Sequence, residues 1–547
     1  MTRNLDPITV SVVSHRLTAI VEEMGEAMLR TAYSQILNSS RDFSAAICDR
    51  DCRLVAQAEH IPVHVGAMPW AAKAVSDRFG EDVHEGDLFV VNDPYAGGGS
   101  HLPDVTVFAP VFIDRRLAFW TINRAHHSDI GGATHGAYNP SATEIFHEGL
   151  RIPPLRLWER GRPREDLLEM MALNVRHPRD FKGDLAAQIG SVRLGEARLQ
   201  ALVDTFDART VMAACEAVLD GAERRSRAEV ATWKEGVFHG EAFLDDDGHG
   251  RHDIAIRATA TVRAGEVTVD LSASDPQSTA FVNSSHANTV SAVTQSFAYL
   301  IDPEIPKNEG AFRPLSVKLK EGTIVWAEDG LPVTMCTSHC GNEIIEAVIT
   351  ALAQSCPART MAGWGRRLRI AIKGRDPRNG RGFIWHMFYA RPGGGGSPGG
   401  DGWHSVGEWH SAGGLKFGSV EVAEVRFPLH IARHEFRPGS GGAGEYRGGC
   451  GAELELRVET EEPAVANTAG DGVRYGARGI LGGEDGLPHR YIHHGSGGGH
   501  VLPSKLVGIE VAPGDVFEVL SGGGGGWGDP ARRPEALAEA DRLDGVA

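Results

Sequence analysis

Residues 88–113, LFVVNDPYAGGGSHLPDVTVFAPVFI, contain the pattern on which the fold depends. Residues 88–92 form an apolar run that predicts a buried strand, and residues 105–113 predict a second strand. Between them lies a loop rich in glycine and proline, residues 93–104. Residues 116–123 predict the strand that returns beside the second one. We therefore expect a sheet in which one loop carries a dense set of polar side chains.

The sequence before this stretch predicts a helix followed by a hairpin. Asp6 is suited to cap the helix and Pro7 to occupy its first turn, and apolar residues then recur at helical spacing up to residue 32. Residues 43–48 and 54–57 have the pattern of two strands joined by a short polar turn. This segment therefore adds a helix and two strands to the N-terminal part.

The sequence after it changes character twice. Residues 163–235 have apolar residues at spacings of three, four and seven, which predicts helices. From about residue 237 the pattern alternates as in strands, with helices predicted at 286–301 and 341–355. The run at 390–402 is dominated by glycine and proline, which predicts a loop free to move. The rest, to about residue 520, predicts short strands between glycine turns.

These patterns together predict a mixed α+β protein of several domains. We expect a β-rich, glycine-rich region at the C-terminal end. The predicted division is an N-terminal α/β region with the candidate metal site (1–160), a helical segment (161–236), an α+β domain (237–390) and the β-rich region (391–547).

Composition excludes several classes of function. The 547 residues include 55 Lys and Arg against 72 Asp and Glu, a net charge of −17, so a general nucleic-acid binder with a basic face is excluded. No apolar run approaches the roughly 18 residues of a membrane span. The N-terminus lacks the apolar core of a secretion signal, and the seven cysteines are sparse. We expect a cytoplasmic protein with reduced thiols.

One constellation of residues suggests metal chemistry. His101 and Asp104 are three residues apart across a proline-stiffened turn, so both side chains can reach one ion. His126 follows the end of a predicted strand and can supply a second imidazole, and Asp42 a second carboxylate. Such a set suits a divalent cation such as Zn²⁺ or Mn²⁺. The alternative is that these side chains cap and tether loops.

Other motifs are weaker. His60 and His64 have the spacing of a helical metal pair, but Pro62 interrupts the helix. Cys336, His339 and Cys340 resemble half of a zinc site without a second half, so a structural role is expected. The glycine runs at 393–396 and 522–526 lack the lysine and hydroxyl of a phosphate-binding loop and are interpreted as backbone turns.

Two further absences matter for the function. Gly395 to Gly399 formally match the G-x-S-x-G pattern of serine hydrolases, but Pro398 has no N–H for an oxyanion hole and no helix follows. The chain also contains no recognisable place for ATP.

The residues resemble the hydantoinase B family, which covers B subunits of ATP-dependent hydantoinases, the C-terminal half of 5-oxoprolinases and a subunit of acetone and acetophenone carboxylases. The matching landmarks run nearly from end to end. They include 6–9 (DPIT), 39–44 (SSRDFS), 60–69 (HIPVHVGAMP), 92–95 (NDPY), 99–104 (GSHLPD), 126–132 (HHSDIGG), 148–154 (EGLRIPP), 441–449 (GGAGEYRGG) and 522–530 (GGGGGWGDP).

The resemblance implies a divalent metal and a set of site residues. The metal ligands are expected at Asp42, His101, Asp104 and His126. Catalytic roles beside the metal or the substrate are expected for His127, Asp129 and Glu148. For His64, the resemblance favours a role in packing or in the wall of the site over direct ligation.

The resemblance also implies a partner and a reaction. A separate hydantoinase A-type subunit would bind ATP and phosphorylate an amide or imide oxygen of a cyclic substrate, in a hetero-oligomer. Metal-activated water in the present chain would then attack the activated carbon. We favour this hydrolase of cyclic amides. The alternatives are a subunit of an ATP-dependent ketone carboxylase and a non-catalytic structural companion. No nucleic acid and no membrane are expected among the partners.

Overall fold

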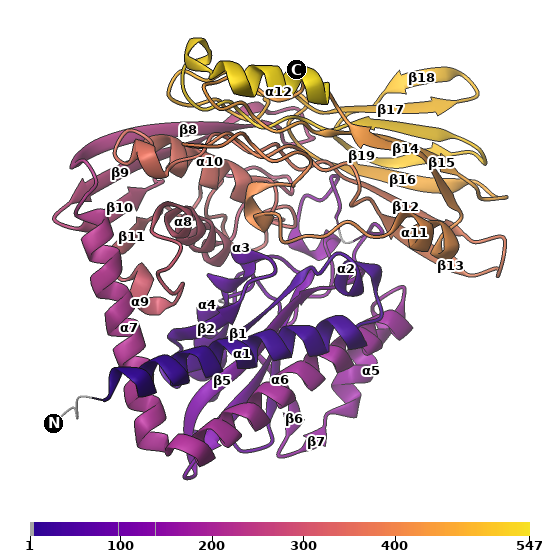
Figure 1. The fold of residues 1–547 in the computed structure, drawn as a ribbon. Helices are drawn as coiled ribbons and strands as arrows, with labels where there is room; N and C mark the ends of the chain where they lie inside the picture. Colours follow the sequence, from indigo (N-terminus) through magenta and orange to yellow (C-terminus); the bar gives the residue numbers. More distant parts are fainter. Residues whose placement is uncertain (1–4, 97, 137, 547) are drawn as a thin grey trace.

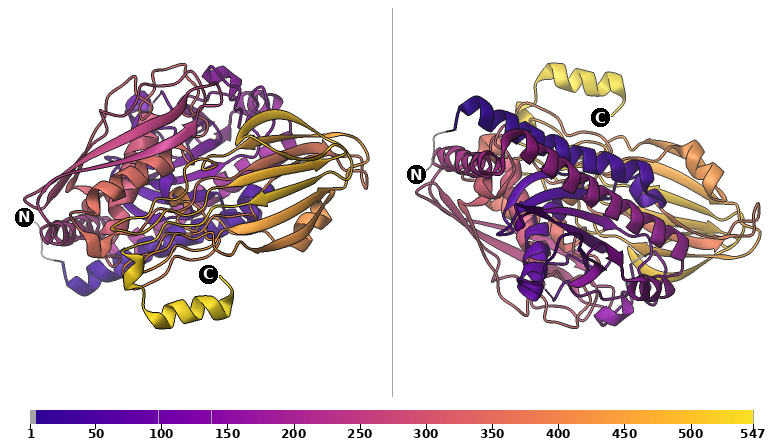
Figure 2. Two further views of the ribbon diagram at one scale, coloured as in Figure 1. Left: turned by 90° about the horizontal axis from the view of Figure 1, so that it is seen from above. Right: turned by 90° about the horizontal axis from the view of Figure 1, so that it is seen from below.

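The first helix shows how local sequence signals build the N-terminal part. The computed structural model describes residues 5–96, 98–136 and 138–546. Helix α1 (Pro7–Thr31) begins as predicted, with Asp6 accepting a hydrogen bond from the backbone N–H of Thr9. Its apolar stripe packs against the long helix α6 (Pro178–Phe206) and against the first sheet. Figure 2, seen from below, shows α1 and α6 side by side across this sheet.

The first sheet has seven antiparallel strands, in the order β2-β1-β5-β4-β3-β6-β7. Side chains of one strand alternate between its two faces. Both faces are buried here, because α1 and α6 cover one face and α4 covers the other. The strands are β1 (Phe43–Asp49), β2 (Leu54–Ala58), β3 (Leu88–Val91), β4 (Asp104–Ile113), β5 (Arg116–His126), β6 (Leu155–Glu159) and β7 (Arg162–Pro163).

A second sheet and two buried helices form the middle of the chain (Figure 1). The strand order is β11-β10-β9-β8, and only β10 and β11 run parallel within it. Helices α8 and α10 pack on this sheet and share one apolar core with it. The elements are β8 (Gly236–Asp246), β9 (His252–Arg263), β10 (Glu266–Asp270), β11 (Leu315–Lys318), α8 (His286–Leu300) and α10 (Cys340–Leu352).

Two further sheets enclose a third core at the C-terminal end. Their orders are β13-β12-β16-β19 and β14-β15-β20-β17-β18, and all their pairings are antiparallel. The strands are β12 (Ile370–Arg375), β13 (Gly382–His386), β14 (Leu429–Phe436), β15 (Ala452–Val458), β16 (Ala464–Ala469), β17 (Arg490–Gly495), β18 (Gly498–Val501), β19 (Lys505–Val511) and β20 (Val516–Leu520).

Shorter helices connect these layers. Among the described residues, no helix combines the length and apolar character needed to cross a membrane. The helices are α2 (Gln35–Asn38), α3 (Pro62–Val65), α4 (Met68–Phe79), α5 (Glu165–Leu173), α7 (Ala208–Val230), α9 (Glu309–Phe312), α11 (Val420–Arg426) and α12 (Glu535–Asp544), with 3₁₀ turns at Ile145–His147, Pro357–Arg359, Trp409–Ser411 and Pro530–Arg532.

The glycine-rich segments pack against one another in the interior. The amide of Gly449 donates to the carbonyl of Gly394, that of Gly524 donates to Gly449, and that of Gly442 donates to Gly524, at 2.8–2.9 Å. A Cβ atom at Gly524 would lie 1.9 Å from the carbonyl oxygen of Gly394. The run at 390–402 is therefore irregular, as predicted, but the expectation that it moves freely is wrong for Gly393–Gly396. These residues are mostly buried and fixed by backbone hydrogen bonds to other segments.

The mixed α+β class with several layers is confirmed. The boundaries of the four predicted regions stay a prediction. The helices of the second region do contribute to the first core, because α6 and α7 pack against the N-terminal sheet and α1.

Candidate metal centre

Three adjacent strands bring three of the expected ligands together. Asp42 directly precedes β1, Asp104 begins β4 and His126 ends β5. Strand β5 lies between the other two, with Asp104 opposite His126, and the His126 amide donates to the Asp42 carbonyl at 3.0 Å. The sheet register therefore places these residues side by side at one end of three neighbouring strands.

Two histidines complete the cluster. His101 Nε2 lies 3.1 Å from Asp104 Oδ1, across the turn closed by the Asp104 amide and the His101 carbonyl. His64, from the short helix α3, places Nε2 3.4 Å from Asp104 Oδ1 and 3.7 Å from Asp42 Oδ1. His126 lies beside His101, with 5.1 Å between the ring centroids. Asp42 is 8 % exposed and the other four residues at most 2 %.

The outer atoms of this cluster are held by hydrogen bonds, whereas the inner atoms face one another without forming them. His101 Nδ1 donates to the carbonyl of Thr334 at 2.5 Å, and the Ser100 hydroxyl donates to Asp104 Oδ2 at 2.5 Å. The two inner atoms, His101 Nε2 and Asp104 Oδ1, face each other at 3.1 Å, and among the described residues neither makes a well-formed hydrogen bond. Unpaired polar atoms are costly to bury. A cation bound between them would remove this cost, so the donor set fits a divalent metal.

The five side chains do not yet form a closed coordination sphere. Within the part of the chain that the structure describes, no three His, Cys, Asp or Glu side chains are arranged as a ready-made metal site. His126 presents Nε2 to the hydroxyl of Tyr138 at 2.9 Å, while its buried Nδ1 has no partner among the described residues. Binding a cation would therefore require the donors to converge.

The electrostatics of the cluster favour a cation. Burial and, after it, the charge of Asp104 together raise the pKa of Asp42 to about 7, against the opposing charges of Arg367, His101 and Arg369. Two carboxylates this close cannot both ionise easily unless a positive charge separates them. Burial also lowers the pKa of His64 to about 4, so its imidazole is neutral near pH 7 and able to bind a metal.

Two of the expected catalytic residues point away from the cluster. His127 places Nε2 2.9 Å from Gln188 Oε1 and packs its ring on Phe181, both on helix α6. Neighbouring residues at a strand end face opposite sides, so His127 lies behind the sheet when His126 lies in front. Asp129 forms an ion pair with Arg176 at 2.8 Å and accepts from its backbone amide. With these contacts, His127 and Asp129 support the fold. Their expected catalytic roles stay predictions.

Glu148 reaches the cluster through a peptide group. Its carboxylate accepts hydrogen bonds from the amides of Val333 and Thr334, at 3.0 and 2.8 Å. The carbonyl of Thr334 in turn accepts from His101 Nδ1. Burial raises the pKa of Glu148 to about 7, opposed by the hydrogen bonds from residues 333 and 334. Glu148 therefore positions the segment that fixes the orientation of His101.

Several residues near the cluster were not foreseen from the sequence. Tyr138 binds His126, and the guanidinium of Arg369 lies 3.4 Å from the centroid of the Tyr138 ring. Arg369 also contacts His386 Nδ1 at 2.5 Å. Arg367 and Arg369 precede β12 and are two residues apart, which in extended backbone places both on one side. This spacing was the one sequence signal that pointed to a pair of arginines on one side of the chain. It did not link them to the cluster, because they lie more than 200 residues from His126 in sequence.

The weaker motifs take structural places. His60 packs on the ring of Phe43, at 4.5 Å between centroids, so of the His60–His64 pair His64 joins the cluster. The thiols of Cys336 and Cys340 donate to backbone carbonyls of Ser100 and Ile324. All seven cysteines are buried and free.

The sequence matches the family model described as hydantoinase B/oxoprolinase over residues 6–530. The chain belongs to this family. It is 36 % identical to the beta subunit of the caprolactamase of Pseudomonas jessenii, a match covering 99 % of this chain and 94 % of that one. It is 29 % identical to the B-type subunit of a putative D-/L-hydantoinase of a Pseudomonas species, covering 99 % and 93 %.

Solved structures agree with this assignment. The crystal structure of the ATP-dependent caprolactamase from Pseudomonas jessenii superposes with a TM-score of 0.92 at 35 % identity, over 100 % of this chain and 95 % of that one. A nucleotide-free acetone carboxylase gives a TM-score of 0.90 at 20 % identity, over 100 % and 78 %, which shows a shared fold. The family resemblance predicted from the sequence is confirmed.

Proposed function

We propose that this chain is the metal-carrying catalytic subunit of an ATP-dependent hydrolase of cyclic amides. The observation that carries the proposal is the buried cluster of Asp42, His64, His101, Asp104 and His126. Its inward-facing nitrogen and oxygen atoms lie close together, and among the described residues His101 Nε2 and Asp104 Oδ1 form no well-made hydrogen bond. The full-length similarity to the beta subunit of a caprolactamase supports a lactam as the substrate.

Asp42, His101, Asp104 and His126 would hold the cation, Zn²⁺ or Mn²⁺, with His64 as an adjoining donor. When bound, such a cation acts as a Lewis acid that makes water nucleophilic near neutral pH. The chain's own residues prepare the site. The carbonyl of Thr334 accepts a hydrogen bond from His101 Nδ1, which leaves Nε2 to bind the cation, and the hydroxyl of Ser100 fixes one oxygen of Asp104.

The proposed partner is a separate A-type subunit that binds ATP. Two relatives are named as one component of a larger enzyme, the beta subunit of a caprolactamase and the B-type subunit of a hydantoinase, which supports an assembly of at least two kinds of chain. A lactam carbonyl is a weak electrophile, so phosphorylation of its oxygen in the partner would create the leaving group. The burial of the cluster would then keep bulk water from competing with the positioned nucleophile.

The hydrolase is favoured over a ketone carboxylase by a specific comparison. The match to the caprolactamase structure is 35 % identical, whereas the match to acetone carboxylase is 20 % identical and supports the fold alone. A carboxylase and a non-catalytic companion are therefore treated as outcomes of the test.

The test is reconstitution with the A-type subunit. Caprolactam, hydantoin and 5-oxoproline are supplied with ATP, and acetone is supplied with ATP and bicarbonate in parallel. We expect ATP-dependent ring opening of at least one cyclic amide, lost in His101→Ala and kept in the control His500→Ala, which alters an exposed strand residue. Bicarbonate-dependent carboxylation without ring opening would instead assign the carboxylase. Full activity of His101→Ala would exclude a catalytic cluster.

A further inference from the structure

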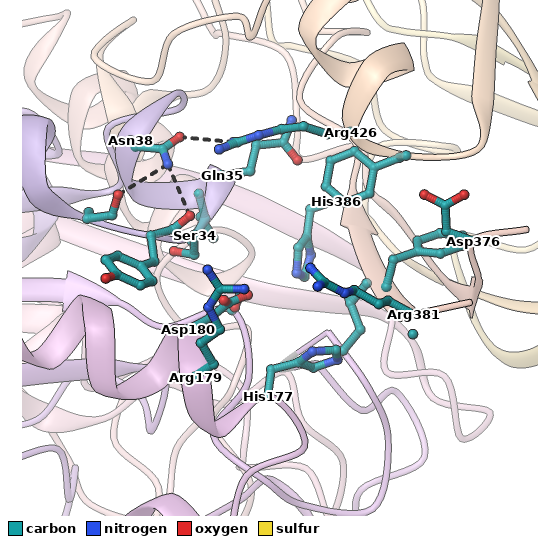
Figure 3. Close-up of a pocket in the computed structure, with 18 of the residues that line it drawn as sticks. Ser34, Gln35, Asn38, His177, Arg179, Asp180, Asp376, Arg381, His386 and Arg426 are labelled. Atoms are coloured by element: carbon teal, nitrogen blue, oxygen red, sulfur yellow. Dashed lines mark hydrogen bonds between the residues drawn. The ribbon is translucent and has the colours of Figure 1, made fainter. Parts of the chain in front are cut away.

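The buried cluster needs an entrance, and one cavity is lined by Ser128, two residues after the candidate ligand His126. A cavity of about 620 Å³ lies between the N-terminal part, at α2 and the start of α6, and the C-terminal part, at β13 and α11. Figure 3 shows Arg179 and Asp180 on the α6 side and Arg381 and Asp376 on the opposite side. The two sides of the cavity are thus formed by segments at least 196 residues apart in sequence, the separation of Asp180 and Asp376.

The charges around this cavity favour an anion. Arg179, Arg381 and Arg426 line it, and within the described chain none of them forms an ion pair with a carboxylate. Arg426 makes only a 3.5 Å hydrogen bond to Asn38. Of the two carboxylates present, Asp376 is already paired with Arg378 at 2.8 Å. Three guanidinium groups without an ion pair among the described residues, of which Arg179 lies over the ring of Tyr33, therefore line the cavity with one unpaired carboxylate, that of Asp180.

The start of α6 adds to this preference. Helix α6 has 29 residues, and its first turn contributes lining residues to the cavity. Its N-cap residue, His177, makes no side-chain hydrogen bond to the first turn. The N-terminus of a helix carries a partial positive charge and free backbone N–H groups, which bind phosphate and other anions.

The inner wall of the cavity connects to the candidate metal centre. His386 lines the cavity, is 4 % exposed, and among the described residues its Nε2 makes no hydrogen bond. Its Nδ1 contacts Arg369, which stacks on Tyr138, and Tyr138 binds His126. A continuous row of side chains thus runs from the cavity to the cluster.

We propose that this cavity is the entrance of the active site and binds the phosphoryl group of a phosphate ester through Arg179, Arg381 and Arg426. The assignment rests on the proposed function for the identity of the ester, a lactam phosphorylated on oxygen. The same guanidinium groups would bind inorganic phosphate, the other product of ring opening. The ring of the ester would then lie toward His386 and the cluster.

Calorimetric titration of the full chain tests the site without turnover. The probes are phenyl phosphate, a ring-bearing ester, and inorganic phosphate. We expect saturable binding of both, with phenyl phosphate tighter if the ester is the physiological ligand and equal binding if the site holds released phosphate. Each of R179Q, R381Q and R426Q should weaken binding by about threefold to tenfold, as expected for exposed charge-assisted hydrogen bonds.

The matched control is R16Q, because Arg16 is exposed on α1 and lies outside the cavity. It should bind both probes like the native chain. No saturable binding, or undiminished binding by the R179Q/R381Q/R426Q triple variant, would overturn the entrance. Loss of association with the A-type subunit in the triple variant, without phosphate binding by the native chain, would also overturn it and assign the arginines to a docking surface.

A second measurement separates this proposal from the function on which it rests. In the reconstituted complex, the triple variant should consume more ATP per ring opened than the native chain, because the phosphorylated intermediate is retained less well. Phosphate binding that depends on the arginines, in a complex that opens no lactam, would keep the anion site and reject the hydrolase. If the triple variant consumes no more ATP per ring opened than the native chain, the proposed entrance is rejected and the proposed hydrolase is kept.

Discussion

His101 Nε2 and Asp104 Oδ1 lie 3.1 Å apart in the protein interior. Their outer atoms are fixed, by the carbonyl of Thr334 and the hydroxyl of Ser100, so the side chains cannot turn outward without losing those bonds. The turn between them is closed by a hydrogen bond from the Asp104 amide to the His101 carbonyl. The pair is therefore held ready for a ligand that accepts electron pairs from both atoms.

The first prediction compares two neighbouring histidines. His126→Asn should lower metal affinity by at least about a hundredfold, because it removes a donor from the cluster. His127→Asn should leave metal binding unchanged, since that ring faces Gln188 and Phe181 behind the sheet. Metal content of the purified variants, measured by mass spectrometry beside circular dichroism, checks both. Asp42→Ala should lose metal like His126→Asn. Equal metal content in His126→Asn and His127→Asn would contradict the proposed ligand set.

Glu148 provides a test of indirect positioning. In Glu148→Gln one carboxylate oxygen becomes an amide NH₂ group, which cannot accept from the amide of Val333 or Thr334. The 333–334 segment should shift and release His101, weakening metal affinity by about tenfold to a hundredfold. Glu144→Gln, four residues away and exposed, is the control. A metal titration of both variants decides, and unchanged affinity in Glu148→Gln would show that the Thr334 carbonyl is held by other contacts.

The close packing of the glycine-rich segments predicts a large effect for one alanine substitution and almost none for another. Gly524→Ala would place a Cβ 1.9 Å from a carbonyl oxygen, so backbone must move and the free energy of unfolding should fall by at least about 2 kcal/mol. Gly400→Ala meets no atom within 4 Å and should change it by less than about 0.5 kcal/mol. Thermal melting followed by circular dichroism measures both. A Gly524→Ala chain as stable as Gly400→Ala would show that the segments are not packed in this way.

His489 should make stability depend on pH. The amide of Gly522 donates to its Nδ1 and its Nε2 donates to the Arg366 carbonyl, so the ring must be neutral. Burial lowers its pKa from 6.5 to about 4, so between these values the unfolded chain binds the extra proton. Stability should therefore fall as pH drops below 6.5, by about 2 kcal/mol from this group at pH 5.

Urea unfolding at several pH values measures this effect. The glutamine in His489→Gln cannot titrate. The slope of the free energy of unfolding against pH, between pH 6 and 5, should therefore fall by the amount that corresponds to about one proton. Other buried histidines, including His135 and His410, also have lowered pKa values and should keep part of the slope in the variant. His500→Gln, on an exposed strand, should match the native slope. An identical slope in His489→Gln would mean that another group carries the dependence.

Much of the first sheet could be predicted because its signals are local. The apolar runs at 88–92 and 105–113 and the cap at Asp6 act within a few residues, and the structure contains the expected strands and helix. The closeness of His101 and Asp104 was also predictable, since a three-residue turn separates them. Their meeting with His126 followed from the expected pairing of adjacent strands.

His64 shows where this reasoning stops. Pro62 breaks the helical spacing, so sequence pattern gave no reason to place residue 64 in the cluster, and the resemblance favoured packing. Helix α3 reaches the cluster through its contacts with β1 and α8, the latter more than 200 residues later in the chain. The packing of the glycine runs against one another was also not predictable from the sequence, because each run taken alone predicts only a turn.

The sequence by itself determined the family, the mixed α+β class and the local turn that pairs an imidazole with a carboxylate, since each depends on residues close together or on motifs in order along the chain. Only the tertiary structure decided that His64 and Tyr138 stand at the cluster, that His127 faces away, and that arginines from three segments surround one cavity. Those relationships arise from packing between distant segments, which local spacing does not encode.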